Sequence, residues 1–358
     1  MITKGSIATY RSGPIVGGHR TLQAERVRIR EWDPAVAPEA ELDAWLRAYN
    51  TALAADLPGD PPWTTTRLRE YLSVTMPGER RLTWLAERDD EVVGYGRLLM
   101  LEGLGVLELY VVPSVRRQGV GDRILKAIAD RAVAEGFGSL GVEVVGGTTA
   151  MDFFPSHGFT HVYTEMRSIL DLATVDWDHL AEMAAGVVHG YRIEYYPGDL
   201  PPDMLKSYAE AKQVRRQDPG VDLDLRPSSY DAARLRASLA CLRERGLMPY
   251  LVVAVHERTE RVAALTELVV PAQHPTRADQ YDTVIVPEHN GYGLARAIKA
   301  RMLAELRTAE PQLADVQTWH ATDREQLQQV NRELGFKPDR EWREYEAEAV
   351  ALAARLKR

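Results

Sequence analysis

LELYVVPSVRRQGVGDRILKAIADRAVAEG, residues 107–136, is the stretch that decides the fold. Its first six residues are almost all apolar and β-favouring, which predicts a strand buried on both faces. Pro113 and Ser114 end that strand. Apolar residues then repeat at helical spacing, and Gly136 closes the predicted helix. The stretch therefore predicts a strand, a tight turn and an amphipathic helix.

The turn, RRQGVG at 116–121, has the composition of a phosphate-binding loop. Glycines let the backbone approach a ligand closely, and the free N–H groups at the helix start point toward it. A dinucleotide fingerprint would need a third glycine where Ile124 stands, and the Gly-Lys-Ser/Thr of a Walker loop is absent. An ordinary strand–turn–helix connection is the other interpretation.

In its strand and helix context, the loop resembles motif A of the GNAT acyltransferase superfamily, Gln/Arg-x-x-Gly-x-Gly/Ala after a strand ending in an apolar-x-Pro step. Arg116, Gly119 and Gly121 fill the pattern. The resemblance implies that the loop amides bind the pyrophosphate of an acyl-CoA, acetyl-CoA or another, and that a strand amide faces the thioester. The implied cofactor-binding residues are Tyr110, Val111, Val112, Arg116, Arg117, Gln118, Gly119, Val120, Gly121 and Asp122. The two arginines could instead form a solvated face.

The second half of the sequence repeats the plan of the first. DTVIVPEHNGYGLARAIKARML at 282–303 is similar to ELYVVPSVRRQGVGDRILKAIA at 108–129, although Asn290 replaces the usual arginine. The chain therefore resembles the tandem type of the superfamily, with an architecture similar to mycothiol synthase. The implied cofactor-binding residues here are Val284, Ile285, Val286, Gly291, Tyr292, Gly293, Leu294 and Ala295.

The fold expected from this resemblance is α/β, with two tandem GNAT-like domains. Each would have a central mixed, twisted sheet flanked by helices, in the order β-α-α-β-β-β-α-β-α-β. We expect a flexible arm over 1–24, an N-terminal domain over 25–170, a linker over 171–190 and a C-terminal domain over 191–358.

Glu108 is the first candidate for a general base, because it is a carboxylate inside an otherwise apolar strand. Burial there would raise its pKa toward neutrality. A structural carboxylate, paired with an arginine or a helix end, is an equally weighted alternative. Asp282 is its counterpart in the second half and has the shorter reach.

The tyrosine that serves as the acid in the superfamily is missing. Phe154 and Asn331 occupy the corresponding positions. Tyr110 or Tyr163 could substitute, the thiolate could leave to solvent, or one domain could lack catalysis. We interpret His157 and His289 as structural.

Composition narrows the possible partners. The net charge of −8 disfavours nucleic acid, and no apolar run is long enough to span a membrane. Cys241 is the only cysteine, which excludes an internal disulfide and a cysteine zinc site, and no ligand spacing indicates another metal. We expect a cytoplasmic protein, monomeric or homodimeric.

The sequence thus predicts an acyl-CoA-dependent N-acyltransferase that acts on the amine of a small molecule, by direct transfer with a carboxylate base. A protein that senses acyl-CoA through degenerate catalytic sites is the alternative, motivated by the missing tyrosines. No motif identifies the acceptor.

Overall fold

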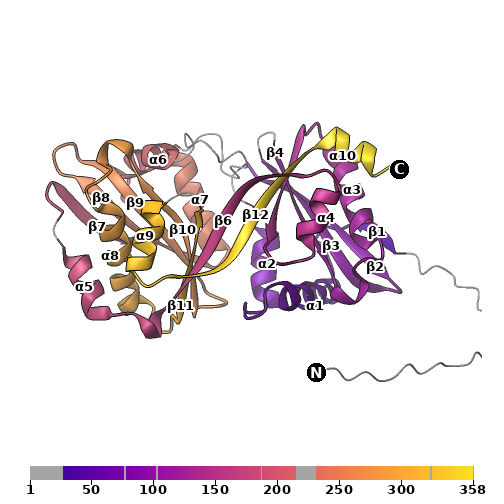
Figure 1. Ribbon diagram of the computed structural model, residues 1–358, viewed down its shortest axis with the longest axis horizontal. Coiled ribbons are helices and arrows are strands. Elements are labelled where there is room, and N and C mark those ends of the chain that lie inside the picture. Colours follow the sequence, from indigo (N-terminus) through magenta and orange to yellow (C-terminus); the bar gives the residue numbers. More distant parts are fainter. Residues whose placement is uncertain are drawn as a thin grey trace, which may run out of the picture.

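The computed structural model describes residues 27–75, 78–101, 104–186, 188–214, 231–322 and 325–357. The arm expected at 1–24 lies outside these ranges. Both halves show the predicted order of elements, β-α-α-β-β-β-α-β-α-β, and two further helices follow β6 and β12 (Figure 1).

The first half contains β1 (Arg28–Glu31), α1 (Glu39–Asp56), α2 (Thr65–Ser73), β2 (Arg80–Arg88), β3 (Glu91–Leu101), β4 (Leu104–Val111), α3 (Val120–Ala134), β5 (Ser139–Val145), α4 (Ala150–Ser156) and β6 (Thr160–Asp171). The second contains α5 (Trp177–Ala185), β7 (Tyr191–Pro197), α6 (Leu205–Val214), α7 (Ala232–Glu244), β8 (Leu247–His256), β9 (Arg261–Pro271), β10 (Arg277–Ile285), α8 (Leu294–Ala309), β11 (Asp315–Ala321), α9 (Glu325–Glu333), β12 (Lys337–Glu348) and α10 (Ala349–Arg355). No helix in the described ranges is both long and apolar enough to cross a membrane.

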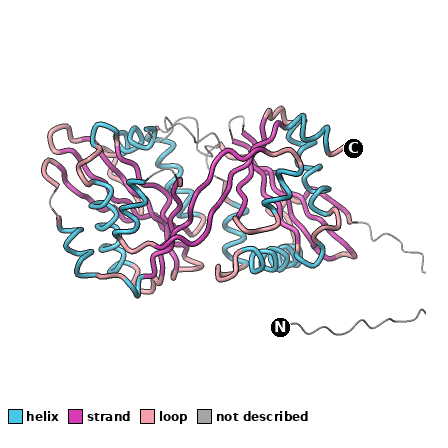
Figure 2. Tube along the Cα trace, in the orientation of Figure 1, coloured by secondary structure: helices cyan, strands magenta, loops and turns pink. Residues whose placement is uncertain are grey.

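The strands form one 12-stranded mixed sheet in the order β1-β2-β3-β4-β5-β12-β6-β11-β10-β9-β8-β7. The last strand of each half crosses to the other: β12 pairs with β5, and β6 pairs with β11. These two strands also pair with each other and run through the middle of the molecule (Figure 2). The predicted α/β class with tandem GNAT-like halves is confirmed, and the strand exchange was not foreseen. The domain boundary proposed after residue 170 stays a proposal. By sequence β6 belongs to the first half, but it pairs with β11 of the second half.

The exchange also mixes the two cores. Tyr345, Ala347 and Leu352, from β12 and α10, are buried in the first-half core with residues of α3 and β5. Leu170 of β6 is buried in the second-half core. In the first half, the face of the sheet that carries Tyr345 and Ala347 is covered by α3, α4 and α10, whereas the opposite face is covered by α1 and α2. Each half therefore depends on the other for part of its interior.

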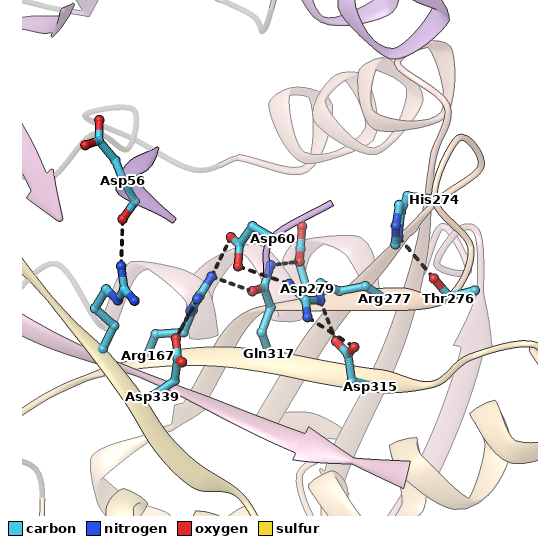
Figure 3. A network of polar contacts seen from close by, with 11 residues as sticks. Asp56, Asp60, Arg167, His274, Thr276, Arg277, Asp279, Asp315, Gln317 and Asp339 are labelled. Atoms are coloured by element: carbon cyan, nitrogen blue, oxygen red, sulfur yellow. Dashed lines mark hydrogen bonds and ion pairs between the residues drawn. The ribbon is translucent and has the colours of Figure 1, made fainter. Parts of the chain in front are cut away.

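A network of ion pairs joins the halves at the loop after α1 (Figure 3). Asp60 Oδ2 accepts from Arg167 Nη1 at 2.7 Å, and Asp60 Oδ1 accepts from Arg277 Nη1 at 3.4 Å. Arg167 also donates to Asp339 at 2.6 Å, and Arg277 donates to Asp315 at 2.6 Å. The two guanidinium groups come from β6 and β10, so they fix the first-half loop against the exchanged strand and the second half.

Candidate functional site

The glycine loop has the same backbone in both halves. Gly119 precedes α3 with φ 79°, and Gly293 precedes α8 with φ 76°. Two residues earlier, Arg117 has φ 61° where the second half has Gly291 with φ 86°. Left-handed φ values favour glycine, so both loops use glycine to bring the backbone into a tight cradle at a helix start. The predicted strand, turn and helix are present.

A pocket of about 410 Å³ opens at the first-half loop. Seven predicted cofactor residues line it: Tyr110, Val111, Arg116, Arg117, Gly119, Gly121 and Asp122. Three others do not, namely Val112, Gln118 and Val120. Val120 is 1% exposed and belongs to the core. Thr148, Thr149 and Phe153 line it too, and no sequence motif had identified them.

Arg116 is held within the protein. Its Nη1 and Nη2 donate to the carboxylate of Asp56 at 2.8 and 2.7 Å, and its Nε donates to Val111 O at 2.9 Å. All three guanidinium nitrogens therefore have internal partners. The anion-binding groups that the loop offers are its backbone amides and the exposed Arg117.

Strands β4 and β5 part beside the pocket. Their parallel pairing ends at Leu107 and Val142. Val112 N donates to Val93 O of β3 at 3.0 Å. Because successive peptide groups of a strand point to opposite edges, the amide of Val111 points into the notch between β4 and β5. The second half repeats this, since β10 and β11 part after Gln280 and Thr318.

Glu108 lies where the strands part and is tied to an arginine. Its Oε1 forms an ion pair with Arg97 Nη2 and accepts from the Tyr71 hydroxyl at 3.5 Å. The Glu108 side chain remains 32% exposed, whereas that of Arg97 is 7% exposed. Glu108 is therefore paired with an arginine, as the structural interpretation of this residue expected, and its side chain is still accessible to solvent. A lone arginine inside the apolar strand at 92–101 was a signal for this partner.

A second carboxylate, Glu143 of β5, was missed. Leu107 and Val142 point into the core under α3, so the next residues, Glu108 and Glu143, point to the opposite face. Glu143 is exposed, yet the nearby protein raises its pKa to about 7. Desolvation is the largest cause, followed by the negative charges of Glu165 and Glu108. Such a pKa suits a general base at neutral pH.

Asp282 sits in a different environment. Its partner across the strands is Glu267, another acid. Lys212 of α6 lies between them, 3.1 Å from Asp282 and 2.5 Å from Glu267. The Asp282 side chain is 7% exposed. The second half therefore has a buried ion network at the position where the first half has an accessible carboxylate.

The second-half loop also opens onto a pocket, of about 800 Å³. Among the predicted residues, Val284, Ile285, Gly291, Gly293, Leu294 and Ala295 line it, whereas Val286 and Tyr292 do not. His289 lines it as well, and its Nδ1 lies 2.8 Å from the Tyr191 hydroxyl. Burial and the neighbouring His256 lower the pKa of His289.

The positions of the missing tyrosine are buried in both halves. Phe154 is 3% exposed and lines the first pocket, and Asn331 is 2% exposed, with its amide nitrogen 3.5 Å from His320 Nδ1.

Burial raises the pKa of Tyr110 well above its ordinary value, so this tyrosine keeps its proton. Tyr163 lines a small second-half cavity. His157 contacts Asp122 at 3.0 Å and Phe153 O at 2.8 Å, which agrees with a structural histidine.

Comparison with known proteins identifies the part of the first half that contains the glycine loop. Residues 79–161 match the family described as Acetyltransferase (GNAT) domain. No curated protein matches the chain.

Solved structures extend the likeness in fold to about nine-tenths of the chain. A tandem GNAT protein from the clavulanic acid biosynthesis pathway has a TM-score of 0.76 at 24% identity, over 90% of this chain and 99% of that one. A GCN5-related N-acetyltransferase from Sphaerobacter thermophilus has a TM-score of 0.67 at 16% identity, over 90% and 96%. A putative acetyltransferase from Pyrococcus horikoshii has a TM-score of 0.56 at 13% identity, over 93% and 92%. The chain therefore contains a GNAT acetyltransferase domain at residues 79–161 and has the fold of a tandem GNAT protein over about 90% of its length.

Proposed function

We propose that this protein is an acyl-CoA-dependent N-acyltransferase whose first half transfers an acetyl group to the amine of a small molecule. One observation carries the proposal: the pocket with the glycine cradle opens beside the place where β4 and β5 part, and two accessible carboxylates, Glu108 and Glu143, follow the last paired residues of these strands without lining the pocket itself. The second half has the cradle and the notch, but its carboxylate is buried against Lys212.

The cradle amides before α3 are suited to hold the pyrophosphate, because they are unsatisfied N–H groups at a helix start. Bound acyl-CoA would supply a thioester whose carbonyl carbon accepts the amine and whose C–S bond breaks. The amide of Val111 would then stabilise negative charge on the carbonyl oxygen. Glu108 is our candidate for the base that takes the amine proton, with Glu143 as the alternative.

The thiolate has no tyrosine to protonate it at the usual position, since Phe154 is there. In our proposal solvent supplies that proton through the open pocket. The same substitution favours the second candidate function, an acyl-CoA sensor that binds without turnover. The second-half pocket is a further acyl-CoA site in either case, and the monomeric or homodimeric state stays a prediction.

A turnover assay separates the two functions. Acetyl-CoA is incubated with the protein and a panel of primary amines, and free CoA is detected with a thiol reagent. Amine-dependent release of CoA supports the transferase. Calorimetric binding of acetyl-CoA without release for any amine supports the sensor, and absence of binding contradicts both.

A further inference from the structure

Arg245 follows α7 in the second half, but its guanidinium group contacts the first half. Its Nε and Nη2 donate to Val74 O, just after α2, at 3.0 and 2.7 Å. Its Nη2 also lies 3.1 Å from Glu79 Oε2. The side chains of Arg245 and Glu79 are only 11% and 5% exposed. Solvent therefore cannot replace these contacts without a change in the packing of the two halves.

The contact continues from Glu79 to Tyr71 of α2. Glu79 also forms an ion pair with Arg81, whose Nη1 donates to Tyr71 O. The guanidinium carbon of Arg81 lies 4.9 Å from the centroid of the Tyr71 ring, and that of Arg245 lies 5.9 Å away. Tyr71 is thus held through its carbonyl oxygen and its ring.

Tyr71 in turn contacts the candidate base. Its hydroxyl donates to Glu108 Oε1 at 3.5 Å and accepts from Arg97, which is the ion-pair partner of Glu108. Burial raises the pKa of Tyr71 to about 12, so the hydroxyl keeps its proton at neutral pH. The end of α2 therefore contacts the Glu108 carboxylate through the Tyr71 hydroxyl, both directly and by way of Arg97.

Among the residues that the structure describes, the second-half carboxylate contacts its own half. Asp282 takes its cation, Lys212, from α6 of the same half, and its neighbour Glu267 accepts from Tyr208 of that helix at 2.7 Å. Within the described residues, this chain of contacts from one half to a candidate base of the other runs from Arg245, just after α7, to Glu108.

We propose that Arg245 is a positioning residue for the first-half reaction, acting on Glu108 through Tyr71, so that the second half completes a site it does not itself contain. The inference rests on the proposed transferase function. It goes further because it gives the second half a part in the first-half reaction, in addition to the cofactor site proposed for it.

Arg245→Met tests the proposal, with Arg243→Met, in the last turn of the preceding helix α7, as the matched control. In the described part of the chain, the polar contacts of Arg243 lie within its own half, to Gly198 O at 2.5 Å and Asp199 at 3.6 Å, and its side chain is 37% exposed. We expect Arg245→Met to lower kcat about tenfold or more, because small displacements of catalytic groups are costly. The dissociation constant of acetyl-CoA and the KM for the amine should stay within about two-fold. Arg245→Lys, which keeps a donor for Val74 O, should recover part of the loss.

Tyr71→Phe keeps the ring and removes the hydroxyl, so it covers the case in which Arg245→Met fails to fold. It should lower kcat in the same way. An active wild type with unchanged kcat in Arg245→Met, or in Tyr71→Phe, overturns this inference alone. A wild type that binds acetyl-CoA but transfers it to no amine overturns the proposed function instead. Hydrogen exchange needs no turnover: amides at 71–75 should lose protection in Arg245→Met but not in Arg243→Met, and equal protection also overturns the inference.

Discussion

Tyr345, near the end of the chain, lies opposite Val142 of β5 and packs in the same first-half core. The pairing of β12 with β5 runs from Ser139 to Val145. A first half without β12 and α10 would expose this strand edge and leave cavities where Tyr345 and Leu352 are buried. Each such loss costs about 2–5 kcal/mol, against a total stability of about 5–15 kcal/mol.

We therefore predict that residues 27–174 expressed alone do not fold cooperatively. Joining residues 336–357 to that fragment through a glycine-rich linker should restore a cooperative thermal transition, because the missing strand and core residues return. Circular dichroism melts of the two proteins are the measurement. A cooperative transition in the short fragment, with β6 taking the place beside β5, would contradict the prediction.

The sequence predicted each half well because its signals are local. The β4–α3 unit is predicted by an apolar run followed by helical spacing. The glycines of that stretch indicate the left-handed φ values that the structure has there. The strand exchange could not be predicted. Both β6 and β12 have the pattern of a strand that could pair with β5, so their sequences do not say which of the two lies beside it.

The site was predicted unevenly for a similar reason. Arg97 and Glu143 were lone charged residues within apolar strands, a pattern that the reasoning on Glu108 had already used. Asp56, which holds Arg116, and Arg245, which holds the end of α2, depend on how distant segments pack. No spacing along the chain encodes those contacts.

Replacing the carboxylates one at a time identifies the general base. Glu108→Gln should cut kcat by about 10²–10⁴, the usual range for general-base catalysis, with acetyl-CoA affinity nearly unchanged. Asp282→Asn should change kcat only a few-fold, because Asp282 is buried against Lys212. Steady-state kinetics, with folding checked by circular dichroism, distinguish these results. Loss of activity in Glu143→Gln but not Glu108→Gln would transfer the role to Glu143, and loss in Asp282→Asn alone would place catalysis in the second half.

Gly119→Glu should abolish acetyl-CoA binding to the first half. It places a negative side chain in the cradle where the pyrophosphate is proposed to bind. Since Gly119 has φ 79°, any other residue is strained there, and Gly119→Ala is the control that shares the strain without the charge. Calorimetry of both variants should show loss of a site with Glu and a weakened site with Ala. Wild-type stoichiometry and affinity in Gly119→Glu would remove the assignment.

Lys299 of α8 gives the last prediction, which concerns stability. It is 2% exposed, and its ammonium group donates to the neutral Gln280 at 2.6 Å. No ion pair is found for it in the described part of the chain, and desolvation is the cause of its pKa shift. Burial lowers its pKa from 10.5 to about 7. The equivalent position in α3 is Leu125, which is fully buried.

Because the folded pKa is lowered, the unfolded chain binds more protons than the folded protein between pH 7 and 10.5. Lys299 therefore makes stability rise with pH across that window, by up to about 1.4 kcal/mol per unit, and its full penalty is present below pH 7. Lys299→Leu should be more stable than wild type near neutral pH, and its advantage should shrink toward pH 9. Urea unfolding of both proteins at pH 7 and pH 9 measures this difference. Lys126→Leu, at a lysine that is 41% exposed, is the control and should show no such convergence. A pH-independent difference between wild type and Lys299→Leu would show that Lys299 keeps its charge in the folded protein.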